Sequence, residues 1–297
     1  AKGLIFSDLI DVFTFENTYT AFFDKPIPDF HRTKWLAWER LAHAATKAPA
    51  IILIDTNTLR AVNEDLFPIF GFSNNLGILC AEAYANKGSF VNYYFPIVNK
   101  ERNWHKVEQI HDFVMNHKSF FDLNASSYNP IGLLFLYSEG MKTRINTYLG
   151  CAQALAESHI PFEVLFDGDD IYLNTTLTLQ ELKKYPLLVI PSITNVTLDQ
   201  INIIKKYVSD GGIALVFDGE ALSFSQVFGE VEYGDGLFYV FEEDFCKSYY
   251  ESYQDVFREQ FINPLLSYYD QSLIVNPQNR KMIITPYIQK ENERIIL

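Results

Sequence analysis

The fold is decided by residues 185–217, which read YPLLVIPSITNVTLDQINIIKKYVSDGGIALVF. The apolar run Pro186–Pro191 is typical of a buried strand, and the apolar residues of Thr197–Ser209 recur at helical spacing. The pair Gly211-Gly212 ends that helix, and Ile213–Phe217 is a second apolar run. A strand, a helix and a strand of these lengths predict two parallel strands joined by a right-handed crossover.

The same alternation precedes this unit. Strands are expected at Ile131–Tyr137 and Pro161–Phe166, with a helix at Thr143–Ser158 between them. A short helix follows at Thr178–Lys184, where Thr178 is a natural N-cap. Residues 131–217 therefore predict a flavodoxin-like α/β domain, with a mostly parallel sheet and helices on both faces.

The first third of the chain also alternates strands and helices. Three βα units are expected, with strands at 9–15, 50–54 and 89–95 and helices at 33–46, 76–85 and 104–121. The polar stretch 122–130 separates them from the second α/β region. Beyond Asp218 we expect a strand at 234–241, a long helix at 250–269, and strands at 281–286 and 294–297.

These patterns divide the chain into three parts. Residues 1–127 form a partial barrel-like domain, 128–247 an α/β domain, and 248–297 a linking helix with β-strands of a C-terminal domain. The chain begins at Ala1 without Met and closes on a predicted strand, so we expect it to be part of a longer protein.

The charge and the numbers of cysteine and histidine restrict the kinds of partner, compartment and cofactor that the sequence favours. The net charge is −13, without a Lys/Arg cluster, which disfavours nucleic acid and anionic membrane surfaces. The 3 cysteines are widely spaced, which disfavours a disulfide framework and favours a reducing, cytoplasmic setting. The 6 histidines lack metal-ligand spacing and no glycine-rich phosphate loop follows a strand, so no cofactor is expected. Aromatic residues make up 15%, which suits either a large core or a sugar-binding cleft.

The order of these segments resembles the back half of family 42 glycoside hydrolases, the β-galactosidases with a trimerisation domain. The resemblance is carried by the strand Tyr185–Ser192 and by the helix that ends Tyr207-Val208-Ser209-Asp210-Gly211-Gly212. It implies that residues 128–247 are similar to that trimerisation domain, a relative of class I glutamine amidotransferases. It also implies that the three upstream units are the last three of a (βα)₈ barrel, and that the protein acts on or binds carbohydrate as a homo-oligomer.

Two carboxylates are the candidate catalytic groups. Glu16 and Asp55 stand at the ends of predicted strands, where the active face of such a barrel lies. The resemblance places the family's nucleophile, a Glu, at the position of Asp55, and its acid/base on a strand that this chain lacks. Asp is one methylene shorter than Glu, which would misplace the reacting oxygen by about 1 Å. Asn17, Tyr19, Trp35 and Asn57 are the expected sugar-binding residues around them.

Other interpretations of Asp55 and Glu16 remain open. Asp55 can cap a turn through its side chain, and Glu16 is as readily structural as functional. The turn Pro191–Asn195 holds no Cys and no flanking Gly, so the second α/β domain is expected to be a scaffold without amidotransferase chemistry. The chain is thus either a glycoside hydrolase fragment, inactive by itself, or a non-catalytic carbohydrate-binding or oligomerisation module. A hydrolase of a different bond on the same barrel is a third reading.

Overall fold

The computed structural model describes residues 13–17, 34–46, 50–55, 81, 83–86, 89–93, 104–121, 126–128, 130–137, 141–168, 177–191, 196–217, 219, 222–224, 226–270, 284, 286–289 and 294–296. The chain forms two compact units. The smaller takes in residues 10–126 and 288–296, and the larger takes in residues 127–287.

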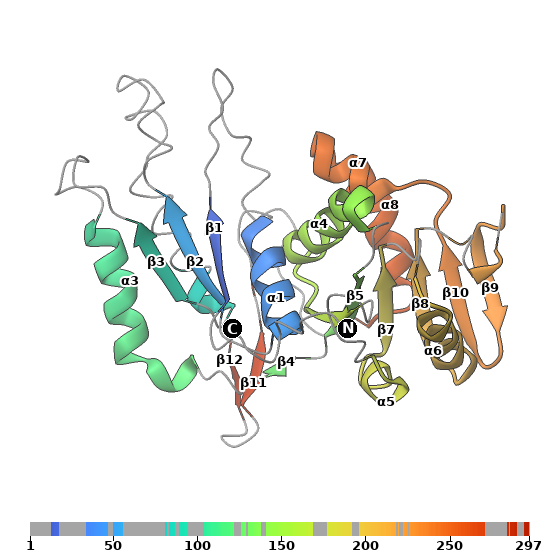
Figure 1. Ribbon diagram of the computed structural model, residues 1–297, viewed down its shortest axis with the longest axis horizontal. Helices are drawn as coiled ribbons and strands as arrows, with labels where there is room; N and C mark the ends of the chain where they lie inside the picture. Colours follow the sequence, from blue (N-terminus) through green and yellow to red (C-terminus); the bar gives the residue numbers. More distant parts are fainter. Residues whose placement is uncertain are drawn as a thin grey trace, which may run out of the picture. The chain divides into compact units, whose positions relative to one another are not determined.

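The smaller unit is built on a parallel sheet of three strands, β1 (Phe13–Asn17), β2 (Ala50–Asp55) and β3 (Ser89–Tyr93), in that order (Figure 1). Helix α1 (Lys34–Thr46) connects β1 to β2, and α3 (Trp104–Asn116) with the 3₁₀ turn η5 (Lys118–Phe120) follows β3. The predicted parallel arrangement of these three strands is confirmed.

Helix α1 shows why the smaller unit folds in this way. Leu36, Ala37, Leu41 and Ala42 recur at helical spacing, and all four are buried. Such a stripe covers one side of a helix and must pack against an apolar surface. The sequence supplies that surface in the apolar strand Ala50–Asp55, which α1 contacts.

The larger unit contains a six-stranded sheet in the order β6-β5-β7-β8-β10-β9 (Figure 1). Its parallel strands are β5 (Ile131–Leu136), β6 (Phe162–Asp167), β7 (Leu187–Ile190), β8 (Ile213–Val216) and β10 (Gly236–Val240). The edge strand β9 (Gly229–Tyr233) pairs antiparallel with β10. Its helices are α4 (Met141–Glu157), α5 (Leu179–Leu182), α6 (Leu198–Ser209), α7 (Phe245–Ser252) and α8 (Asp255–Leu266).

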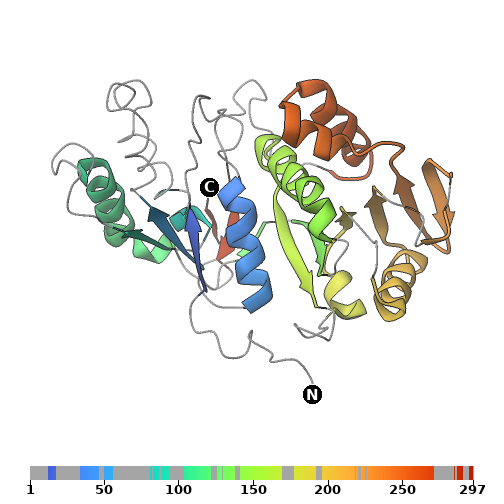
Figure 2. The same ribbon diagram turned by 45° about the horizontal axis from the view of Figure 1, so that its top comes forward.

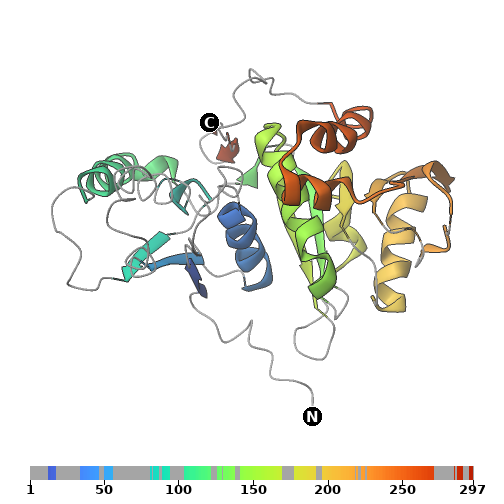
Figure 3. The same ribbon diagram turned by 90° about the horizontal axis from the view of Figure 1, so that it is seen from above.

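Helices cover both faces of this sheet, as the sequence predicts. Leu134 and Leu136 of β5 belong to the same buried cluster as Val208 of α6. Phe135, between them, turns to the opposite face, where its ring meets Tyr148 of α4 edge to face at 4.9 Å. Successive strand residues alternate between faces, so α4 and α6 lie on opposite sides of the sheet. Figures 2 and 3 show α7 and α8 beside α4, which they contact.

Two predictions for the later part of the chain are wrong in detail. The single helix expected at 250–269 is two helices, because Tyr253 adopts a left-handed conformation with φ of 57° and ends α7. The strand expected at 234–241 begins only at Gly236, because Gly234 has φ of 65° and forms the turn of the β9–β10 hairpin. Three short strands, β4 (Ser126–Ser127), β11 (Tyr287–Gln289) and β12 (Arg294–Ile296), form a further sheet in the order β12-β11-β4.

Candidate functional site

The carboxyl ends of the small parallel sheet carry both candidate acids. Glu16 and Asn17 are the last two residues of β1, and Asp55 is the last residue of β2. Glu16 is in register with Leu53, and Asn17 with Ile54, so Asp55 stands one residue further toward the edge than Asn17. Parallel strands are about 4.8 Å apart and rise about 3.3 Å per residue, which places the Cα atoms of Glu16 and Asp55 about 8 Å apart.

The register also assigns these positions to faces of the sheet. Residues in register on neighbouring strands share a face, and the face alternates along each strand. Positions 16, 53 and 55 therefore belong to one face, and positions 17 and 54 to the other. Positions 16 and 55 share a face, whereas position 17 belongs to the opposite face.

One residue at this edge was missed by the sequence reasoning. Tyr93 is the last residue of β3 and is in register with Asp55, so it ends its strand on the face that also carries positions 16 and 55. The sequence predicts that this strand runs to residue 95, so nothing in the sequence marks Tyr93 as the residue that ends it. Two acidic residues and a tyrosine thus lie at the ends of neighbouring strands, at one edge of the sheet.

The structure says less about the positions of the other predicted site residues, Trp35, Tyr19 and Asn57. Trp35 is the second residue of α1, the helix that leads from β1 to β2. Tyr19 and Asn57 lie outside the described residues. The expected convergence of Asn17, Asn57 and the aromatic pair on the two acids stays a prediction.

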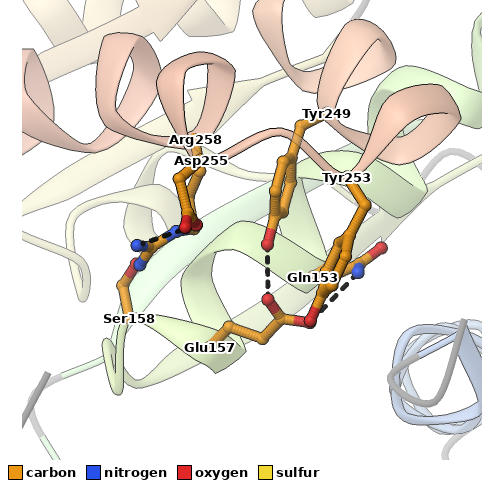
Figure 4. A network of polar contacts seen from close by, with 7 residues as sticks. All are labelled: Gln153, Glu157, Ser158, Tyr249, Tyr253, Asp255 and Arg258. Carbon is orange, nitrogen blue, oxygen red and sulfur yellow. Dashed lines mark hydrogen bonds and ion pairs between the residues drawn. The ribbon is translucent and has the colours of Figure 1, made fainter. Parts of the chain in front are cut away.

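The larger unit holds a buried polar network around Glu157, the last residue of α4 (Figure 4). Its carboxylate accepts hydrogen bonds from the hydroxyl groups of Tyr249 and Tyr253, and from Nε2 of Gln153 at 3.0 Å. Burial, and next the Glu157 carboxylate, raise the pKa of Tyr249 well above its ordinary value. These contacts tie α7 to α4 in the interior, so the network holds the fold together.

Arg258 of α8 adds a second tie beside this network. Its guanidinium donates to Oγ of Ser158 at 3.1 Å and pairs with Asp255 at 3.3 Å (Figure 4). Polar side chains thus link α4, α7 and α8, the described helices on this side of the sheet.

A second buried acid, Asp167, is also structural. It ends β6, is fully buried, and accepts from the backbone N–H of Leu177 at 2.7 Å and from Nε2 of Gln200 at 2.8 Å. Gln200 is the N3 residue of a capping box with Thr197 at the start of α6. Because both carboxylate oxygens serve as acceptors, Asp167 holds Leu177 and the start of α6 beside the end of β6.

Other candidate chemistry falls partly outside the described residues. Ser192, in the turn compared with an amidotransferase nucleophile, is one such residue. Within the described part of the chain, no group of three or more His, Cys, Asp or Glu side chains is placed to hold a metal ion. Among the described helices, none combines the length and apolar character needed to cross a bilayer.

Comparisons with known proteins find solved glycosidases whose fold is similar to that of this chain. No protein-family model matches the sequence, and no curated protein matches it. The solved structures with a similar fold include the following three. An α-L-fucosidase from Paenibacillus thiaminolyticus gives a TM-score of 0.53 at 11% identity, over 85% of this chain and 50% of that protein. A family 42 β-galactosidase from G. stearothermophilus gives 0.53 at 10% identity, over 84% and 50%. An exo-β-1,4-mannosidase from Opitutaceae bacterium strain TAV5 gives 0.54 at 12% identity, over 87% and 59%.

These likenesses show the fold. The chain has a mixed α/β architecture of parallel strands and helices, similar to that of glycosidases with TIM-barrel-like domains. It spans 50–59% of the length of the three proteins.

Proposed function

We propose that this chain is part of a glycoside-hydrolase-related protein that binds carbohydrate at the carboxyl edge of β1, β2 and β3. The observation that carries the proposal is the placement of Glu16 and Asp55 at one edge of a parallel sheet, in a chain with a glycosidase-like fold. The three strands would correspond to the last three of a barrel, whose active face is formed by the carboxyl ends of its strands. Tyr93 joins the two acids as a binding residue.

The finer family assignment belongs to the same proposal. The order β6-β5-β7-β8-β10 is the 2-1-3-4-5 order of flavodoxin-like sheets, which supports a domain similar to the trimerisation domain of family 42 enzymes. That likeness favours a homo-oligomer, which sedimentation at several concentrations would test. A cytoplasmic location also stays a prediction.

The two classes of glycosidase differ in the distance between their carboxyl groups. Retaining glycosidases hold their two carboxyl groups about 5–5.5 Å apart, and inverting ones hold them about 6.5–9.5 Å apart. Side chains that start about 8 Å apart at their Cα atoms can reach either separation. The shorter Asp at position 55 favours the alternative function, a module that binds sugar without cleaving it, because a nucleophile about 1 Å out of place loses about a hundredfold in rate.

The test compares Glu16→Gln and Asp55→Asn with the parent chain. Binding of galactose and a panel of other monosaccharides would be measured by calorimetry, and hydrolysis of the matching aryl glycosides by absorbance. A hydrogen bond to a charged group contributes about 1.5–3 kcal/mol, so each variant should bind about tenfold to a hundredfold more weakly. Asp112→Asn, at an exposed position on α3 of the same unit, is the matched control and should bind like the parent.

The outcomes separate the two functions. Binding that is weakened in both variants, with turnover in the parent, supports a hydrolase. The same weakening without turnover in the parent supports the binding module. Unchanged binding in both Glu16→Gln and Asp55→Asn would remove this edge as the site.

A further inference from the structure

Helices α4 and α7 approach each other more closely than side chains normally allow. A Cβ atom added to Gly150 of α4 would stand 1.9 Å from the backbone carbonyl oxygen of Cys246 in α7. Real atoms never come so close, so only glycine permits this contact. The backbones of the two helices therefore touch at Gly150, next to Cys151.

The close approach brings two cysteines together. Cys151 and Cys246 are both fully buried, and each thiol affects the pKa of the other. A disulfide requires Cα atoms about 4.4–6.8 Å apart and side chains that point at one another. Helices with ordinary side chains between them have axes about 8–10 Å apart. Two cysteines on neighbouring helices therefore come within the disulfide range only where a small residue lies at the helix crossing. Gly150 supplies it.

The ends of the same interface are fastened by polar contacts. Asp244 caps the start of α7 by accepting from the N–H of Lys247 at 2.9 Å, and it pairs with Arg144 of α4 at 3.3 Å. Glu157 and Tyr249 join the other end of α4 to α7. The two sulfur atoms thus lie between two fixed points, which holds them in register.

We propose that Cys151 and Cys246 are a cross-linking site, at which oxidation forms an intramolecular disulfide between α4 and α7. The oxidant is a low-molecular-weight disulfide such as oxidised glutathione. The thiolate of one cysteine attacks a glutathione sulfur and releases one reduced glutathione, which leaves a mixed disulfide on the protein. The second cysteine loses its proton and attacks the protein sulfur of that mixed disulfide, which releases a second reduced glutathione. Two S–H bonds and one S–S bond are broken, and one protein S–S bond and two glutathione S–H bonds are formed.

The surroundings of the two cysteines determine the rate at which the disulfide forms. Burial is the main cause that raises the pKa of both thiols, and the carboxylate of Asp244 raises it further. The attacking thiolate is therefore scarce in the closed structure, unlike the exposed, low-pKa cysteines of redox sensors. The reaction needs α7 to lift from α4 transiently, and the product is shielded from reduction once α7 has closed.

The experiment uses the full chain, reduced and then incubated with oxidised glutathione until no further change occurs. The protein is denatured, alkylated and mapped by mass spectrometry. The reduced chain takes one label on each of its 3 cysteines. The oxidised chain should take a label on Cys80 alone, and should yield one peptide pair linked through Cys151 and Cys246.

Matched variants keep the test decisive. Cys151→Ser and Cys246→Ser should each abolish the linked pair, whereas Cys80→Ser should leave it unchanged. Full labelling of Cys151 and Cys246 after oxidation would overturn the proposal. A glutathione adduct that persists on either residue, or a cross-link that joins two chains, would do the same. The wild-type peptide map decides the matter even where a serine variant fails to fold.

Discussion

Replacing Tyr249 with Phe is the sharpest test of the α4–α7 interface. The substitution removes one hydroxyl group and leaves the buried ring, which stacks on Tyr253 at 5.5 Å. That hydroxyl donates to the buried Glu157 carboxylate. A hydrogen bond to a charged group is worth about 1.5–3 kcal/mol, so we expect the free energy of unfolding to fall by about 2 kcal/mol.

Tyr253→Phe is the matched control, because it removes a hydroxyl from the same carboxylate. Its hydrogen bond is long, at 3.4 Å, and lies in a partly buried place, so its loss should cost less than about 1 kcal/mol. Urea unfolding followed by circular dichroism measures both variants, and a loss of about 2 kcal/mol corresponds to about 4–8 °C in thermal midpoint. Equal losses in the two variants would contradict the conclusion that Tyr249 makes the stronger hydrogen bond to Glu157.

Two further perturbations test packing and ionisation. Gly150→Ala should lower the free energy of unfolding in urea by at least about 3 kcal/mol, because the added Cβ would overlap the Cys246 carbonyl. In the control Gly229→Ala the added Cβ meets open space, so only the left-handed backbone, with φ of 81°, is strained. That variant should lose about 1 kcal/mol. Similar costs for both would refute the close contact. Burial raises the pKa of Tyr207 to about 12 in the folded chain against an ordinary value of 10, so its contribution is complete below pH 10 and is lost between pH 10 and 12. In Tyr207→Phe the fall in unfolding free energy across that window should be shallower by up to about 1.4 kcal/mol per pH unit, and an unchanged slope would contradict the burial argument.

The alternation of apolar runs and helical patterns was enough to predict the architecture. Ile131–Leu136, Leu187–Ile190 and Ile213–Val216 are continuous apolar strands, and such strands are buried on both faces of a parallel sheet. Capping residues could also be predicted, since Thr178 accepts a hydrogen bond from the N–H of Glu181 as expected. Strands and helix caps of this kind can be predicted because they depend only on residues that are close together in the sequence.

What the sequence could not show depends on distant neighbours or on rare backbone conformations. Tyr253 ends α7 in a left-handed conformation that a bulky residue seldom adopts, so the pattern indicated one continuous helix. The wide spacing of the cysteines gave no sign of the pair, because Cys246 lies on another helix more than ninety residues from Cys151. The acids Asp167 and Glu157 resemble candidate catalytic groups in sequence, and only their buried donors identify them as structural.

The outer strand β9 shapes how this unit meets other chains. Its sequence alternates glutamates with apolar residues, and Glu230 and Glu232 are exposed along the last strand of the six-stranded sheet. A copy of the chain that added its own β9 there would bring rows of like charge together, which opposes strand pairing. Like charge therefore disfavours the pairing of two copies of the chain through β9, and we expect a symmetric assembly to use another surface than this edge.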